Sequence, residues 1–240
     1  MRVLISALVN SLLNVGLVCA ALLWFVYQSP LSPLPNALNP FTPFDLNDPV
    51  TVITWRKLDL LTVDANSCLE TLQALSVSYE KREDFQQTDQ CGIPQRILLT
   101  GLRDTAIGPV ETQCHIAVRL ALWERDILQS ASNTAFSEPV AEVLTQGSYN
   151  CRAVRTENGN GSAMSEHATA NAMDVKGVKL ASGREILLER DWNGFRDGAT
   201  FLREIGKGGC NLFRATLGPE YNSLHEDHFH FDAGRFRICR

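Results

Sequence analysis

The chain has 240 residues, of which 45% are hydrophobic and 20% are charged. This length accommodates one or two domains with a substantial core, and this composition excludes an intrinsically disordered protein. The formal net charge is −5, which argues against a general nucleic-acid-binding protein because such proteins carry a basic surface. We therefore expect no nucleic acid among the partners.

The N-terminal region is almost free of charge. Arg2 is its single charged residue, and residues 3–44 are uncharged. Residues 3–27 are nearly all apolar, and as a helix they would span about 37 Å, enough for a hydrocarbon core of roughly 30 Å. A cleaved signal peptide has a shorter apolar stretch and a small-residue cleavage site, whereas Trp24 and Tyr27 suit an interfacial aromatic belt. We predict an uncleaved transmembrane anchor over residues 1–28, with its N-terminus in the cytoplasm.

A proline-rich segment follows the predicted anchor. Proline at high density disfavours helix and sheet, which predicts a stiff, extended linker over residues 29–49. Without Arg2, the chain keeps 21 basic and 27 acidic side chains, a net charge of −6 for the exported part. Six of the ten prolines lie in this linker: Pro30, Pro33, Pro35, Pro40, Pro43 and Pro49.

Cysteine usage agrees with export. Cys19 lies within the predicted anchor, and six cysteines follow it. An even number of cysteines in an oxidising compartment predicts three disulfides, for which 15 pairings are open. Buried free thiols are the alternative interpretation, and export makes it the weaker one. The six are Cys68, Cys91, Cys114, Cys151, Cys210 and Cys239.

Hydrophobic periodicity predicts an α+β fold in which a small antiparallel sheet packs with helices after the transmembrane helix. Residues 50–145 are predicted to form a mainly helical N-terminal part, with an amphipathic helix along Cys114, Ala117, Val118, Ala121 and Leu122. Residues 146–240 are predicted to form the part that bears the site.

Shorter elements are predicted around the site. We expect a short helix at 140–143, a strand at 147–154, a glycine-rich turn at 158–162, and strands at 170–175, 184–188 and 227–232. We also expect a helix at 194–205 that ends at a group of glycines. The glycines are Gly206, Gly208 and Gly209.

The predicted strand at 227–232 alternates charged or imidazole residues with phenylalanine. In a strand, His228, His230 and Asp232 share one face, while Phe229 and Phe231 point into the core on the other. The two imidazoles then lie about 7 Å apart along the strand. This spacing fits one metal ligand and one base or supporting residue.

A second segment contributes His167 and Asp174, with Met173 and Val175 facing the core. In isolation, a satisfied core histidine and a turn carboxylate would be the more ordinary interpretations. Four of the five histidines fall in these two segments, however, which favours a shared site. A His-Asp-His set suits Zn²⁺ and leaves a fourth position for water. We interpret the fifth histidine, His115, as structural or at the surface.

These motifs carry a resemblance to a known group. The pattern Ser-x-His-x₆-Asp at 165–174, followed by His-x₂-His-x-His at 225–230, resembles the zinc site of the LAS group, which includes lysostaphin-type enzymes, D-Ala-D-Ala metallopeptidases and the hedgehog signalling domain. The run His-Glu-Asp-His-Phe-His is similar to that of the penicillin-insensitive murein endopeptidase.

The chain resembles the bacterial extensin-like C-terminal domain family more closely, over roughly residues 65–240. The matching motifs are Gly-Ser-Tyr-Asn-Cys-Arg at 147–152, Ser-Glu-His at 165–167, Ala-Met-Asp-Val at 172–175, Asp-Trp at 191–192, Leu-Gly-Pro at 217–219, His-Phe-His at 228–230 and the terminal Cys-Arg at 239–240.

The resemblance implies roles for individual residues. It implies that the zinc ligands are His167, Asp174 and His230, with His228 and His225 as further active-site histidines. Asp227 stands where the carboxypeptidase branch has its glutamate base, and it is one methylene shorter. The resemblance therefore leaves the general base open between Asp227 and His228. It also implies that Arg152 or Arg155 binds a substrate carbonyl or carboxylate and that Ser165 supports the first histidine, so Arg152 and Ser165 are the expected substrate-side residues.

The function implied by the resemblance is an exported, membrane-anchored zinc peptidase that acts on peptidoglycan cross-links or stem peptides. Its expected cofactor is Zn²⁺, and its expected location is the bacterial inner membrane, single-pass, with the folded domain in the periplasm. A zinc-stabilised wall-binding or scaffold domain without turnover is the alternative. A binding module whose histidines are incidental is a third.

Overall fold

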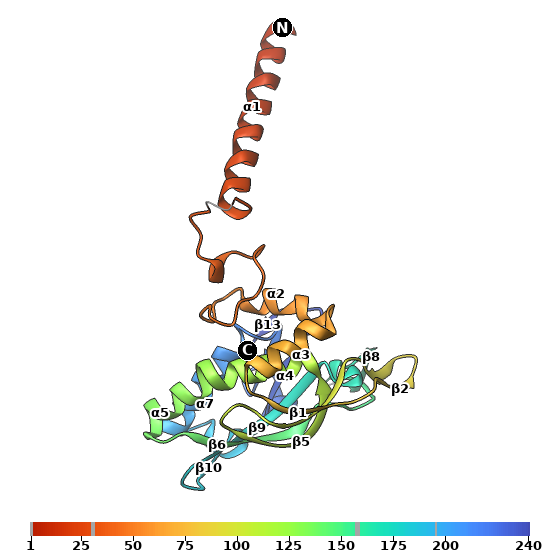
Figure 1. Ribbon diagram of the computed structural model, residues 1–240, viewed down its shortest axis with the longest axis vertical. Helices are drawn as coiled ribbons and strands as arrows, with labels where there is room; N and C mark the ends of the chain where they lie inside the picture. The colour runs from red at the N-terminus through yellow and green to blue at the C-terminus, as the bar shows by residue number, and fades with distance from the viewer. Residues whose placement is uncertain (1, 30–31, 157–158, 195) are drawn as a thin grey trace.

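The computed structural model describes residues 2–29, 32–156, 159–194 and 196–240. A long N-terminal helix, α1 (Arg2–Tyr27), projects away from an α+β domain (Figure 1). Its segment Val9–Tyr27 is long and apolar enough to span a membrane by length and composition. Three sequence predictions fall partly outside the described residues: Pro30 of the linker, Asn158 of the turn and Phe195 of the helix.

The connector between α1 and the domain is folded, and not extended as its prolines suggest. It contains the short helix η1 (Asn36–Leu38) and wraps around Lys57, a buried residue of α2 (Thr54–Leu58). The Lys57 ammonium donates to the Asn36 carbonyl, to the Thr42 hydroxyl at 2.9 Å and to the Pro43 carbonyl at 3.4 Å. A buried ammonium needs all its donors satisfied, so this lysine closes the proline-rich segment into a loop.

Nine strands form one mixed sheet in the described chain, larger than the small antiparallel sheet expected from the sequence. The strand order is β1-β4-β5-β6-β9-β12-β11-β13, with β10 paired to β9. The β5–β6 and β11–β13 pairs are parallel and the others antiparallel. The strands are β1 (Ser78–Lys81), β4 (Arg96–Gly101), β5 (Ala106–Gln113), β6 (Val140–Gly147), β9 (Ala172–Leu180), β10 (Glu185–Leu187), β11 (Ala215–Leu217), β12 (Phe229–Asp232) and β13 (Ile238–Cys239).

Residues 50–145 are not mainly helical, which corrects the sequence-based expectation. Between its helices, this part contributes β1, β4 and β5 to the sheet and forms a separate hairpin of β2 (Phe85–Thr88) and β3 (Cys91–Ile93). The expected amphipathic helix is present as α4. The helices of this part are α2, η2 (Asp59–Thr62), α3 (Ala65–Ala74), α4 (Cys114–Trp123), the π-helical turn η3 (Glu124–Leu128) and α5 (Gln129–Phe136).

Three local expectations near the site also need correction. The segment 140–143 is not a helix but the start of β6, which is held between β5 and β9. The expected strand at 147–154 is the end of β6, a loop and the start of β7 (Ala153–Thr156). The expected turn at 158–162 is largely strand β8 (Gly159–Met164), which pairs with β7. Tertiary strand pairing overrides local propensity in each case.

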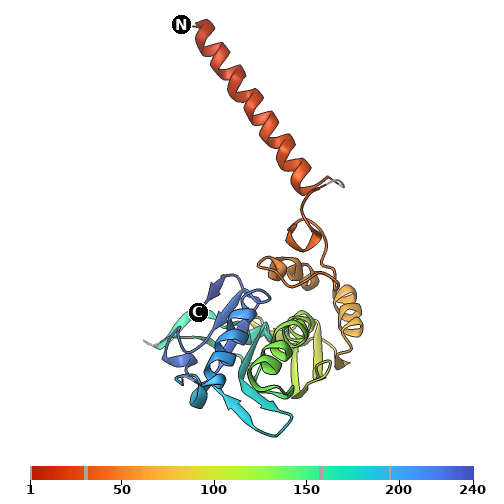
Figure 2. The same ribbon diagram turned by 90° about the vertical axis from the view of Figure 1, so that its left-hand side faces the viewer.

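Helices α3, α4, α5 and α7 (Asp197–Gly209) gather on one side of the sheet (Figures 1 and 2). Helix α7 was expected to stop before its glycines, but it runs through them. A Cβ at Gly206 would lie 2.7 Å from the Phe229 ring, and one at Gly209 would lie 2.8 Å from the Phe231 ring. Gly206 and Gly209 therefore let the helix pack closely against the buried phenylalanines of β12.

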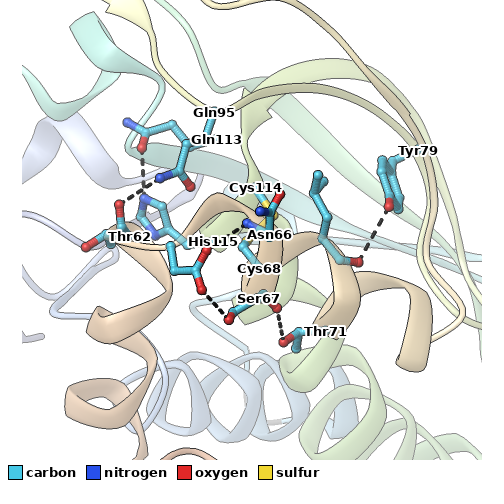
Figure 3. The surroundings of a disulfide bond; sticks show 12 residues. Thr62, Asn66, Ser67, Cys68, Thr71, Tyr79, Gln95, Gln113, Cys114 and His115 are labelled. Carbon is cyan, nitrogen blue, oxygen red and sulfur yellow. Dashed lines mark hydrogen bonds between the residues drawn. A yellow bond between two sulfur atoms is a disulfide. The ribbon is translucent and has the colours of Figure 1, made fainter.

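Three disulfides are present among the described residues, as the cysteine count predicts. They join Cys68 to Cys114, Cys91 to Cys151, and Cys210 to Cys239, while Cys19 of α1 is free and exposed. The first ties α3 to the start of α4 (Figure 3). The second ties β3 to the loop before β7, and the third ties the end of α7 to β13. The remaining α6 (Leu188–Asp191) lies between β10 and α7, and the turns η4 (Glu166–Thr169) and η5 (Ser223–His225) lie between strands.

Candidate metal centre

The candidate metal centre is built on the pairing of β9 with β12. These strands are antiparallel, and Asp174 stands directly opposite His230. Phe229 and Phe231, the neighbours of His230, are buried on the opposite face of β12. Because successive side chains of a strand alternate between faces, the buried phenylalanines direct His230 to the face that carries Asp174.

His167 reaches the same point from the turn η4, just before β9. Ser165 caps this turn, and its hydroxyl accepts a hydrogen bond from the His167 amide at 3.3 Å. The ring is fixed from the other side, since its Nδ1 lies 2.8 Å from the backbone carbonyl oxygen of Ser148. Ser148 follows Gly147, whose φ of +111° suits glycine and redirects the chain at the end of β6.

Three potential ligand atoms converge here. The Nε2 of His167 lies 3.1 Å from Oδ1 of Asp174 and 3.0 Å from Nδ1 of His230, and the last two atoms lie 3.0 Å apart. These three side chains could hold a metal ion. Ligand atoms around a tetrahedral zinc lie roughly 3.4 Å apart. The cluster would need to open by only a few tenths of an ångström to fit the ion.

Hydrogen bonds at the outer nitrogens orient both rings. A carbonyl oxygen can only accept, so Nδ1 of His167 carries the hydrogen toward Ser148, and Nε2 presents a lone pair to the cluster. Nε2 of His230 lies 2.9 Å from Oδ2 of Asp232, which leaves Nδ1 facing inward. Metal-binding histidines are oriented by carboxylates and carbonyls in this way. Asp232 and Ser148 are thus supporting residues that the sequence analysis did not assign to the site.

The cluster attracts positive charge. Burial raises the pKa of the Asp174 carboxyl, but its close contacts with the His167 and His230 rings outweigh burial and hold the pKa below its ordinary value. Burial lowers the pKa of His230, whereas the carboxylates of Asp174 and Asp232 raise it, with a net value of about 9. Two lone pairs and a carboxylate that face one another require a cation between them, and a proton or a divalent metal ion can fill that role.

His228 lies beside the cluster, immediately before β12. Its Nε2 is 3.6 Å from Oδ1 of Asp174, and its Nδ1 is 2.6 Å from Oδ1 of Asp227. Asp227 also accepts a hydrogen bond from the Gln146 amide at 3.1 Å. Asp227 therefore holds the His228 ring at Nδ1, while Nε2 of the same ring lies on the side of Asp174.

His225 forms the next layer, in the turn η5. Its Nδ1 lies 2.6 Å from Oδ1 of Asn222, and its ring centroid is 5.3 Å from that of His228 and 5.9 Å from that of His230. Burial lowers the pKa of His225, and the neighbouring imidazoles lower it further, to about 4. His225 is therefore neutral near pH 7, with Nε2 as a hydrogen-bond acceptor.

Arg152 lies at the edge of the cluster. Its Nη1 donates only to the carbonyl of Ala153, at 3.3 Å, and its buried Nε has no partner in the described part of the chain. Burial lowers the pKa of Arg152, as does the charge of Arg155, while the negative charge of Asp174 raises it. A buried donor without a partner is suited to a ligand carbonyl or carboxylate. The Arg152 charge thus interacts with that of Asp174, while Ser165 acts on the cluster through the turn that carries His167.

An α+β domain whose central sheet carries a buried His-Asp-His cluster defines a class of candidate metalloproteins. Within that class, the model of the extensin-like protein C-terminus family matches residues 66–240. The chain belongs to this family, which confirms the resemblance noted in the sequence over nearly the same residues. No curated protein and no solved structure matches the chain.

Proposed function

We propose that this protein is an exported, membrane-anchored zinc-dependent peptidase that acts on peptide cross-links or stem peptides of peptidoglycan. The observation that carries the proposal is the convergence of His167, Asp174 and His230, with both rings oriented from outside and His228 3.6 Å from the shared carboxylate. The three disulfides and the apolar α1 support export, since disulfides persist in oxidising compartments. The resemblance of the histidine motifs to LAS-group peptidases supports the substrate class.

The residues of the chain divide the chemistry among them. When bound, zinc supplies Lewis acidity and lowers the pKa of a coordinated water. His228 accepts a proton at Nε2 from the attacking water and then donates it to the leaving amine, while Asp227 holds the Nδ1 hydrogen of the same ring. Arg152 donates from its guanidinium to a carbonyl or carboxylate of the substrate. In this proposal, the general base is His228, and Asp227 positions it.

Digestion of purified peptidoglycan tests the proposal. The zinc-loaded, disulfide-intact protein is incubated with isolated sacculi, and released peptides are identified by mass spectrometry. We expect His228→Gln to keep its zinc and lose about 10²-fold or more in rate, as loss of general acid–base catalysis does. Asp227→Asn should lose less, since the imidazole remains. Arg152→Gln removes the guanidinium proposed to bind the substrate. Its matched control is Arg103→Gln, because Arg103 is exposed and paired only with Asp104 in the described residues.

The same assay distinguishes the peptidase from a zinc-stabilised wall-binding or scaffold domain without turnover. If the zinc-loaded protein releases no fragments while a known murein endopeptidase does so under the same conditions, the enzyme proposal fails. Stoichiometric zinc that is lost in His167→Ala would then leave a zinc-stabilised wall-binding or scaffold domain. If the wild-type protein binds no zinc, both functions fail together.

A further inference from the structure

The end of the domain nearest α1 carries a group of arginine and aromatic side chains that the proposed site does not use. We call it the arginine–aromatic patch. Phe236 is 71% exposed and Val52 is 61% exposed, so the patch offers apolar as well as basic groups to solvent. It stands out because the chain as a whole is acidic, with a net charge of −5. The patch consists of Val52, Trp55, Arg56, Arg235, Phe236 and Arg237.

The connector holds this patch against the end of α1. The side chain of Asn39 donates to the Tyr27 carbonyl at 2.9 Å, and the rings of Tyr27 and Phe41 meet edge-on with centroids 5.5 Å apart. Arg56 lines the same surface hollow as Trp24, Tyr27 and Phe41. Trp and Tyr at the end of a membrane helix lie at headgroup level. Arg56 therefore lies at that level when α1 spans a membrane.

Trp55 stacks with Arg237 of the patch and with the neighbouring Arg214, whereas Arg235 lies over the Phe236 ring at 6.0 Å from its centroid. Arg237 lies over the Trp55 ring at 4.8 Å from the centroid, and Arg214 lies at 5.0 Å. The Nη2 of Arg237 also donates to the Val52 carbonyl at 3.4 Å. A guanidinium stacked on an aromatic ring keeps its edge donors available for a bidentate contact with a phosphate.

The acidic groups next to the patch are already neutralised. Asp59 binds both Arg119, at 2.8 Å, and Arg214, at 2.6 Å. Asp48 pairs with the buried Lys57 at 3.6 Å. By contrast, none of the patch arginines has a carboxylate within ion-pair distance in the part of the chain that the structure describes. Their positive charge is available to a partner outside the domain.

We propose that the arginine–aromatic patch binds anionic phospholipid headgroups of the membrane in which α1 is anchored. Arginine is suited to lipid phosphates, and exposed Phe236 and Val52 are suited to shallow insertion at the interface. The anchor favours this partner, because it holds the patch permanently within reach of the bilayer surface. The domain then lies on the membrane in a fixed orientation. This inference rests on the proposed insertion of α1 and not on the metal chemistry.

Lipid-dependent quenching of Trp55 fluorescence tests the inference. The full chain carrying Trp24→Phe is reconstituted into vesicles of brominated phosphatidylcholine, with or without phosphatidylglycerol. We expect bromine to quench Trp55 when the anionic lipid is present and much less in neutral vesicles. About 1 M salt should reverse the difference, since the Debye length falls to about 3 Å. Trp55→Phe in the same background measures how much of the quenched fluorescence comes from the remaining tryptophans.

Two double variants complete the experiment. We expect Arg235→Gln/Arg237→Gln to lose at least half of the quenching that depends on the anionic lipid. Arg82→Gln/Arg103→Gln removes the same charge from exposed arginines that pair with Glu80 and Asp104, and it should behave as the parent. Equal quenching in neutral and anionic vesicles, or no quenching in either, would overturn the inference. Failure of the chain to float with the vesicles would overturn it as well, while zinc binding could still be measured.

Discussion

Asp174 and His230 are directly opposite partners in the β9–β12 ladder, and their Oδ1 and Nδ1 atoms lie 3.0 Å apart. The backbone register therefore fixes the separation of two of the three candidate ligands. Only His167 depends on a turn; Ser165 caps that turn, and the Ser148 carbonyl holds Nδ1 of the His167 ring. A site whose donors are held by a sheet is preorganised for its ion, so changes at single supporting residues should have measurable consequences.

Asp174→Asn should weaken zinc binding by at least about 100-fold, more than the loss of a supporting residue costs. The amide is nearly the same size as the carboxylate but has no charge to offer the cation. Isothermal titration of the metal-free protein at pH 7 measures the effect. Asp104→Asn changes an exposed aspartate in the same way and should leave the affinity as it is. Equal affinities for the two variants would contradict the assignment of Asp174 as a ligand.

Asp232→Asn should weaken zinc binding by roughly 10–100-fold, although Asp232 lies outside the ligand set. Asp232 Oδ1 accepts a hydrogen bond from the Gly234 amide at 2.8 Å. Asparagine keeps this acceptor oxygen, so the local turn is preserved. The pKa of His230 in the metal-free variant should fall below its wild-type value of about 9, because one of the two carboxylates that raise it is gone. Histidine NMR titration checks this second effect. An unchanged His230 pKa would remove Asp232 from its positioning role.

Gly206→Ala should destabilise the fold by roughly 1–2 kcal/mol, although alanine favours helices. The added Cβ would lie 2.7 Å from the buried Phe229 ring, and overpacking of about 1–3 kcal/mol outweighs the helical gain. Gly198→Ala is the matched control in the same helix. A Cβ there meets its nearest atoms at 3.6 Å, so this variant should be as stable as the wild type or more so. Urea unfolding in detergent micelles compares the two variants, and only Gly206→Ala is expected to lower the free energy of unfolding.

His115 should make the fold sensitive to acid. Its ring is buried beside the Cys68–Cys114 disulfide (Figure 3), Nε2 lies 3.0 Å from Oε1 of Gln113, and Nδ1 has no partner in the described chain. Burial lowers the pKa of His115, and the positive charge of Arg119 lowers it further, to about 3. The unfolded chain takes up this proton near pH 6.5, whereas the native state does so only near pH 3.

The stability contributed by the neutral ring is therefore complete above pH 6.5 and declines as the pH falls toward 3. The decline is about 1.4 kcal/mol per pH unit. His115→Gln has no titrating group and should lose less stability than the wild type between pH 7 and pH 4.5, by up to roughly 2.7 kcal/mol. The other histidines are common to both proteins, so their contributions cancel in the comparison. Parallel stability–pH curves would show that His115 does not carry the effect.

The helix of α1, the strand at β12 and the residue types of the cluster could all be predicted from the sequence. Each depends on a local pattern: an uncharged apolar run over residues 3–27, phenylalanines that alternate with His230, and histidines concentrated in two segments. The presence of three disulfides follows from six cysteines after the anchor. Their pairing does not, because it depends on which chain segments the fold brings within bonding distance.

The supporting contacts could not be predicted in the same way. The backbone carbonyl of residue 148 would orient His167 with any side chain at that position, so no residue type in the sequence marks this contact. Strands β1, β4 and β5 are partly exposed, and their apolar pattern is weaker than that of the helices around them.

What the sequence determined by itself are the local periods and the chemical inventory: a membrane-length helix, an even set of cysteines, and histidines and aspartates suited to a cation. Only the tertiary structure decided that Lys57 folds the proline-rich connector, that two glycines of α7 pack against β12, and that Asp232 turns Nδ1 of His230 inward. The physical reason is that hydrogen-bond partners and sheet register join residues far apart in the chain, and their energies exist only when the chain is folded.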